Sequence, residues 1–177
     1  MNQIFISCPK NSENMLANEI EKIRGKKIKI SNGGVFLLNG NLHDIYGIAL
    51  KSALAIRVLL QIQEFTFENE KDIYNNLKRI HWADIFSEKQ TILIQTNFRS
   101  TELKNSNYIS QLTKDAICDY FREKTGSRPD VAKRDPEISI NIYIHKNHCS
   151  VNLDCIGKSL NKRGYRKKDV PATLKET

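Results

Sequence analysis

The sequence lacks the glycine-rich motifs by which many enzymes hold a nucleotide. It contains no GxxxxGK[ST] loop, and no predicted strand is followed by GxGxxG. Such loops cradle phosphates with backbone N–H groups, so both of these nucleotide-binding classes are excluded. No arrangement of side chains in the sequence indicates an active site, and we expect no catalytic residue within these 177 residues.

The sequence also gives little support for a metal site. His145, His148 and Cys149 are close together, but they fall on a predicted hairpin. Alternate residues of a strand point to opposite faces of its sheet, so these side chains cannot all reach one ion. A zinc site needs more ligands than this cluster offers. We therefore expect these residues to bind neither a metal nor a cofactor.

Long apolar runs are absent as well. No early segment is long enough for a membrane span or a secretory signal, and residues 2–7 are typical of a strand. The sequence therefore predicts a cytoplasmic protein without membrane contact. Its four cysteines (Cys8, Cys118, Cys149 and Cys155) are widely spaced and form no CxxC motif. We expect them to be reduced and packed as small apolar groups.

Positive charge, by contrast, is abundant. The 28 Lys and Arg exceed the 20 Asp and Glu, which gives a net charge of +8 and indicates a polyanionic partner, most simply nucleic acid. The basic run Lys158–Lys168 holds six cations and no anion, with Gly164 and Tyr165 among them. Because it follows a predicted strand, this run leaves a folded scaffold at a fixed point and could bind phosphates in a defined place. The alternative is a solvated tail, which is what charge runs usually are.

Hydrophobic periodicity predicts an α+β fold. The first half reads strand, helix, strand, strand, helix, strand, with elements at 4–6, 13–24, 27–30, 35–38, 42–50 and 56–67. This order is typical of a ferredoxin-like layer of helices on one sheet. The apolar stripe of the second helix is predicted to consist of Leu42, Ile45, Tyr46, Ala49 and Leu50.

The second half also alternates helices and strands. Helices are expected over 70–80 and 106–124 and strands over 92–96, 138–145 and 148–155. Gly126 is the natural stop of the longer helix. The last two strands form a hairpin, and its turn, Lys146-Asn147, is expected to place Asn147 at positive φ.

Three features outside the basic run suit RNA. The first is Gly126-Ser127-Arg128-Pro129, followed by Lys133-Arg134. Its glycine and proline would fix the path of the loop and hold Arg128 in place. An ordinary helix-to-strand connection is an equally good interpretation. The second is Gln95–Arg99, because polar and cationic groups at a strand's end can meet a phosphodiester backbone, although Phe98 suits the core better. The third is Lys51 with Arg57, and Arg57 equally suits an internal salt bridge.

Several motifs, taken in order, resemble those of one family. They are Phe5–Lys10, Asn32–Val35, Lys51–Leu60, Ile80–Trp82, Gly126-x-Arg128-Pro129, and Leu153-Asp154 leading into Gly157-x-Ser159-Leu160-x-Lys162-Arg163-Gly164-Tyr165-Arg166. Over essentially its whole length the chain is similar to the N-terminal portion of bacterial 23S rRNA guanine-N2 methyltransferases of the RlmL type. That portion comprises a ferredoxin-like part and a THUMP domain, an RNA-binding module also found in thiouridine synthases and tRNA methylases.

The resemblance implies a ferredoxin-like part over residues 1–55, packed with or inserted into a THUMP α/β domain over 56–156 with mixed sheets. Residues 157–177 would be a basic linker towards an absent methyltransferase domain. Neither the glycine-rich S-adenosylmethionine loop nor the (Asp/Asn)-Pro-Pro-(Tyr/Phe) motif of that domain occurs here. The chain would then be a fragment that captures a structured hairpin of 23S rRNA for that domain and has no activity alone.

The predicted RNA contacts are the cations of the loop, the strand end and the basic run, with one aromatic residue. They are Arg99, Arg128, Lys133, Arg134, Lys158, Lys162, Arg163, Tyr165, Arg166, Lys167 and Lys168. Tyr165 either stacks on a base or packs the run against the scaffold. Two alternatives stay open: the RNA-binding part of a tRNA-modifying enzyme, and a basic module that contacts an acidic protein.

Overall fold

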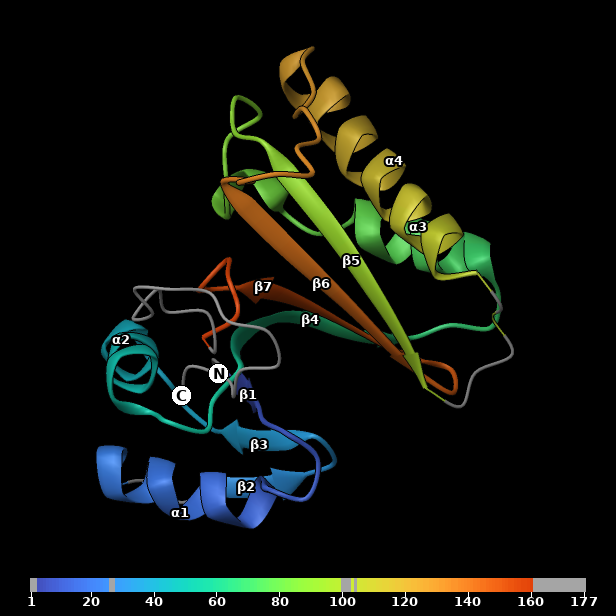
Figure 1. The fold of residues 1–177 in the computed structure, drawn as a ribbon. Helices are drawn as coiled ribbons and strands as arrows, with labels where there is room; N and C mark the ends of the chain where they lie inside the picture. Colours follow the sequence, from blue (N-terminus) through green and yellow to red (C-terminus); the bar gives the residue numbers. More distant parts are fainter. Residues whose placement is uncertain (1–2, 26–27, 100–102, 104, 161–177) are drawn as a thin grey trace, which may run out of the picture. The chain divides into compact units, whose positions relative to one another are not determined.

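The structure is a computed structural model that describes residues 3–25, 28–99, 103 and 105–160 (Figure 1). The chain divides into two compact units, the first drawn from residues 1–60 and 154–177 and the second from residues 61–153. Strands β4 (Arg57–Thr66) and β7 (His148–Asp154) each cross this division. None of the helices in the described ranges is long and apolar enough to cross a membrane.

The first unit is an antiparallel sheet with two helices. Its elements are β1 (Ile4–Ser7), α1 (Glu13–Arg24), β2 (Ile28–Ser31), β3 (Gly34–Leu37), α2 (Leu42–Lys51) and the start of β4. Strand β1 pairs with β3 and β4, and β2 pairs with β3, which gives the order β2-β3-β1-β4. This β-α-β-β-α-β arrangement confirms the predicted ferredoxin-like order.

Helix α2 is apolar on two sides, and only one of them packs into the core. Ile45 and Ile48 are buried, whereas Leu42, Tyr46 and Leu50 are 63%, 59% and 76% exposed. The predicted apolar stripe was therefore wrong for these three residues. On the same side as Ile45 and Ile48, Asp44 is buried in an ion pair with Arg24 of α1.

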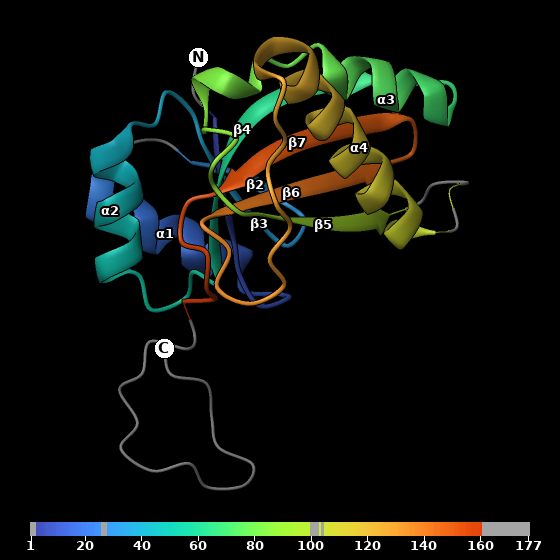
Figure 2. The ribbon, with the colours of Figure 1, turned by 90° about the horizontal axis from the view of Figure 1, so that it is seen from above.

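The second unit is a mixed sheet covered on one face by helices. Its further elements are α3 (Glu70–Lys78), the 3-10 helix η1 (Trp82–Asp84), β5 (Ile92–Arg99), α4 (Ser106–Thr125), β6 (Ile138–His145) and β7. The strand order is β4-β7-β6-β5, with β6 antiparallel to β7 and parallel to β5. Helices α3 and α4 lie on the same face of this sheet (Figure 1; Figure 2). The predicted α+β class and mixed sheet are confirmed.

An aromatic cluster holds the core of this unit. The Trp82 ring lies 6.0 Å from Phe86, and Phe86 lies 5.2 Å from Phe121 of α4. Trp82 Nε1–H donates to Leu77 O at 2.9 Å, so the fully buried indole has its partner.

Two local predictions for the second unit were wrong. Strand β5 continues to Arg99, three residues beyond its expected end, because Phe98 packs into the core and Arg99 O accepts from Lys146 N at 3.3 Å. In the hairpin turn, Lys146 has the positive φ (54°), while Asn147 O accepts from Phe67 N at 3.0 Å.

Candidate nucleic-acid interface

Arg128 lies in a loop whose first residues are set by the end of α4. Gly126 closes the helix with a left-handed φ of 76°, and its N–H donates to Arg122 O at 3.0 Å. That conformation favours glycine, which has no Cβ to clash with the backbone. Pro129 is buried directly after the exposed Arg128. The guanidinium is therefore carried by a short segment that is anchored on both sides.

The rest of this loop is bonded to the start of β5. Ile92 N donates to Asp130 O at 2.8 Å, and Ala132 N donates to Ile92 O at 3.1 Å, on the edge of β5 that faces away from β6. Farther on, Glu137 Oε2 accepts from Thr91 N at 2.9 Å. These bonds hold residues 130–132 and Glu137 against the start of β5.

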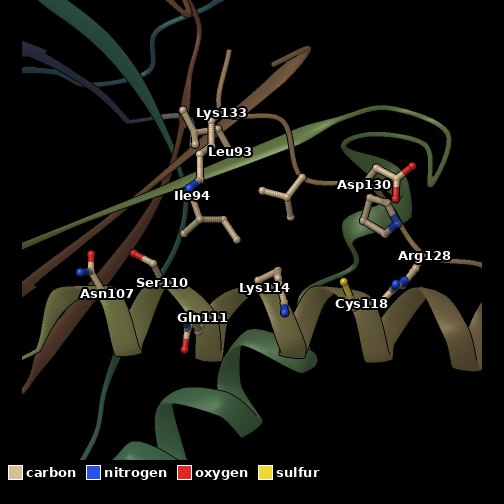
Figure 3. A pocket seen from close by; sticks show the side chains of 12 residues that line it. Leu93, Ile94, Asn107, Ser110, Gln111, Lys114, Cys118, Arg128, Asp130 and Lys133 are labelled. Atoms are coloured by element: carbon tan, nitrogen blue, oxygen red, sulfur yellow. The ribbon is translucent and has the colours of Figure 1, made fainter. Parts of the chain in front are cut away.

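A groove of about 740 Å³ lies between this loop, the edge of β5 and one side of α4 (Figure 3). The helix lines it with residues spaced three or four apart, which share one side of an α-helix. The groove residues are Leu93, Ile94, Asn107, Ser110, Gln111, Lys114, Cys118, Arg128, Pro129, Asp130, Val131 and Lys133.

Positive charge dominates the groove. Lys114, Arg128 and Lys133 line it, against the single carboxylate of Asp130. Arg128 and Lys133 are exposed, and Lys114 is partly exposed with its Nζ 2.8 Å from Asp115 Oδ1. Guanidinium, ammonium, amide and hydroxyl groups on one rigid surface are the donors that proteins use for phosphate and sugar oxygens.

The Cys118 thiol at the base of the groove lies close to these positive charges. Burial raises the pKa of Cys118, and the positive charges of Lys114, Arg128 and Arg122 act in the opposite direction. Because the net shift is upward, the thiol is protonated at neutral pH and is a poor nucleophile. Its environment is that of a packed side chain beneath a cationic surface.

The C-terminal end of β7 forms a second fixed point, in the first unit. The Asp154 carboxylate is 3% exposed and pairs with the Arg57 guanidinium. Its Oδ1 also accepts from Ile156 N at 3.1 Å and from Gly157 N at 3.2 Å. Of the two roles considered for Arg57, the structure therefore shows the internal salt bridge.

This fixed point positions the start of the basic run. Leu160 is buried in the core of the first unit, and its N–H donates to Ile56 O at 2.8 Å. Lys158, between Gly157 and Leu160, is exposed. The other predicted contacts of the run lie outside the described residues: Lys162, Arg163, Tyr165, Arg166, Lys167 and Lys168.

The structure brings together only part of the predicted set. Arg128 and Lys133 share the groove, and Arg134 is exposed beside Lys133. Arg99 is exposed at the end of β5 in register with His145 of β6, and it does not line the groove.

Sequence reasoning missed the contribution of α4 to the groove. Lys114, Asn107 and Gln111 line the groove but were not among the predicted RNA contacts. Their spacing, continued by Cys118, marks a second side of α4, distinct from the core side that holds Ile117 and Phe121. That polar stripe was the available signal, but only the folded loop shows what it faces.

Two family models match this chain. The RlmL ferredoxin-like domain matches residues 3–59, and the THUMP domain matches residues 67–154. Among the described residues, no group of three or more His, Cys, Asp or Glu side chains is arranged to hold a metal ion.

Known proteins match nearly the whole chain. It is 33% identical over 176 residues to the ribosomal RNA large subunit methyltransferase K/L of Cellvibrio japonicus, covering 99% of this chain and 23% of that protein. A predicted N6-adenine-specific DNA methylase from Listeria monocytogenes has a similar fold, with a TM-score of 0.85 at 21% identity over 99% of this chain and 46% of that chain. The crystal structure of SMU.472 complexed with SAH also has a similar fold. Its TM-score is 0.77 at 23% identity, over 94% of this chain and 44% of that chain. This chain therefore spans under a quarter of that methyltransferase and less than half of either solved chain.

Proposed function

Because this chain belongs to the family of RlmL-type rRNA methyltransferases, through its ferredoxin-like and THUMP domains, we propose that it binds structured RNA and presents it to a methyltransferase domain. The observation that carries the proposal is the cationic groove. Three cations on an anchored loop and a long helix form a rigid, positively charged surface in the part of the chain that matches the THUMP model. Phosphate contacts of this kind determine position and orientation on an RNA.

The proposed substrate is a hairpin of 23S ribosomal RNA, and the proposed reaction is methylation of a guanine by S-adenosylmethionine. The name of the Cellvibrio relative supports the RNA class, and SAH in the SMU.472 structure, the demethylated product of that cofactor, supports the methyl donor. The groove itself does not fit the cofactor, because its three cations would repel the positively charged sulfonium. The methyl transfer would belong to a separate domain.

The binding part of the proposal is tested by titrating RNA hairpins against the chain and against a triple variant, Lys114→Ala, Arg128→Ala and Lys133→Ala. Each lost phosphate contact should reduce the log–log salt slope by about 0.7 to 0.9, so the triple variant should lose roughly two units or more. A control triple of exposed cations elsewhere, Lys22→Ala, Lys71→Ala and Lys89→Ala, should change the slope less.

Two results would contradict the proposal. One is undetectable binding of any RNA at low salt, and the other is an equal slope for the two triples. Tighter binding of tRNA than of rRNA hairpins would support the groove as the RNA-binding surface but contradict the proposed rRNA substrate. The catalytic part is tested by the coding sequence that follows residue 177, where an (Asp/Asn)-Pro-Pro-(Tyr/Phe) motif is expected.

A further inference from the structure

The second unit has a polar sheet face opposite its helices. Thr96 Oγ1 lies 2.8 Å from Ser110 Oγ of α4, and Ile142 is buried in the core, so these side chains mark the helix side. The alternate residues of β5, β6 and β7 point the other way. After a row of Leu93 and Ser139, their register forms three rows across all three strands: Gln95, Asn141, Asn152; Asn97, Tyr143, Ser150; and Arg99, His145, His148.

The nine residues of these three rows are all polar or aromatic. They comprise four amides, two imidazoles, one hydroxyl, one phenol and one guanidinium. A solvated sheet face is polar by default, so polarity alone points to no ligand. The ring of Tyr143, the amides and the guanidinium of Arg99 are the kinds of group with which proteins bind unpaired RNA.

Most of the exposed surface lies in the second and third rows, and Gln95 is the one exposed residue of the first row. Asn141 and Asn152 of the first row are only 8% and 6% exposed, whereas Tyr143 is 37% exposed. Asn97 and Arg99, at the edge of the sheet, are exposed too. Rows two residues apart are separated by about 6.6 Å and neighbouring strands by about 4.8 Å. The accessible platform is therefore about the size of one nucleotide.

We propose that this face holds an unpaired base of the RNA, stacked on the Tyr143 ring. Asn97, in the same row, offers an amide donor and acceptor to the edge of the base, and Arg99 in the next row reaches its phosphate. An unpaired nucleotide is required because a duplex hides both faces of its bases, and proteins read single-stranded RNA by such stacking. This inference rests on the proposed RNA-binding function and adds to it a single-stranded element in the substrate.

The test uses an RNA hairpin whose loop contains 2-aminopurine, a base that loses fluorescence when it stacks. With the full chain we expect quenching on binding. Tyr143→Ala should weaken binding roughly 5- to 100-fold and remove the quenching, whereas Tyr143→Phe, which keeps the ring, should retain both. An abasic site at the quenched position should weaken binding of the wild type and have little further effect on Tyr143→Ala. Tyr46→Ala, at a 59% exposed tyrosine of α2, is the control and should behave as wild type.

The outcomes separate this inference from the function on which it rests. If Tyr143→Ala binds and quenches as the wild type does while the groove triple weakens binding, the stacking platform is wrong and the groove stands. If the wild type binds no RNA at low salt, the proposed function fails and the platform fails with it. Loss of binding by Tyr143→Phe as well as by Tyr143→Ala would also contradict stacking, because the ring alone should suffice. Circular dichroism of both variants shows whether they are folded.

Discussion

The guanidinium of Arg24, at the end of α1, is paired with the carboxylate of Asp44 in the first turn of α2. Arg24 Nε donates to Asp44 Oδ1 at 2.6 Å, and the Asp44 side chain is fully buried while Arg24 is 13% exposed. Asp44 also completes the capping box of α2, since its Oδ2 accepts from Asn41 N at 2.8 Å. A buried carboxylate needs such compensation for its lost hydration.

Arg24→Ala should therefore be strongly destabilising. The substitution leaves the Asp44 charge buried and unpaired, and removing one partner of such a pair costs about 3 to 5 kcal/mol. Urea unfolding followed by circular dichroism measures the change. Arg122→Ala breaks an exposed pair with Asp119 and should cost less than about 1 kcal/mol. An equal loss of unfolding free energy in the two variants would contradict the larger contribution expected of the buried pair.

The apolar stripe of α2 was predicted wrongly for three of its residues, Leu42, Tyr46 and Leu50. Periodicity identified an apolar stripe, but α2 has two apolar sides and the pattern cannot rank them. The buried side also carries the pair of Asp44 with Arg24, twenty positions apart in the chain, and a single sequence gives no register for such a pair. The succession of strands and helices along the first unit was predictable because it depends on local runs and turns.

Gly34→Ala should destabilise the first unit by about 1 to 3 kcal/mol, as overpacking does. A Cβ at this position would overlap the Ile6 carbonyl oxygen and lie 2.7 Å from Phe5 Cζ, and backbone in a paired strand cannot withdraw. The neighbouring Gly33 has a positive φ of 78° and open space around it. Gly33→Asn is therefore the control and should be nearly neutral, because asparagine tolerates this conformation. Thermal denaturation of both variants compares them, and a more damaging Gly33→Asn would contradict the steric explanation.

The candidate interface was predictable only where local chemistry determines it. Gly126 and Pro129 indicated an anchored loop for Arg128, and the structure has that loop. Lys114 could not be assigned, because its place in the groove depends on the packing of α4 beside the loop. The row of Asn97, Tyr143 and Ser150 likewise needs the pairing of three strands, which hydrophobic pattern alone does not supply.

Cys149 should make stability fall at alkaline pH. Burial raises the pKa of this thiol to about 12, whereas an unfolded chain has a cysteine pKa of about 8.5. The unfolded state then loses its proton first, so the stabilisation is complete below about pH 8.5 and declines as pH rises towards 12. The stability advantage of the wild type over Cys149→Ala should shrink by about 1.4 kcal/mol per pH unit in this window. Urea titrations between pH 8 and 11 measure that gap, and a constant gap would contradict the prediction.

Asp154→Ala should loosen the start of the basic run as well as lower stability. The substitution removes the partner of Arg57 and the acceptor of two backbone N–H groups, at Ile156 and Gly157. Charge-assisted bonds of this kind are worth about 1.5 to 3 kcal/mol each, and they act on the segment that carries Lys158. Limited proteolysis with trypsin should cut after Lys158 faster in the variant than in the wild type. Asp154→Asn keeps an oxygen for the backbone donors but not the charge, so it should weaken the fold with a smaller gain in cleavage. If both variants are cut at the wild-type rate, Asp154 stabilises the unit without fixing the point from which the basic run departs.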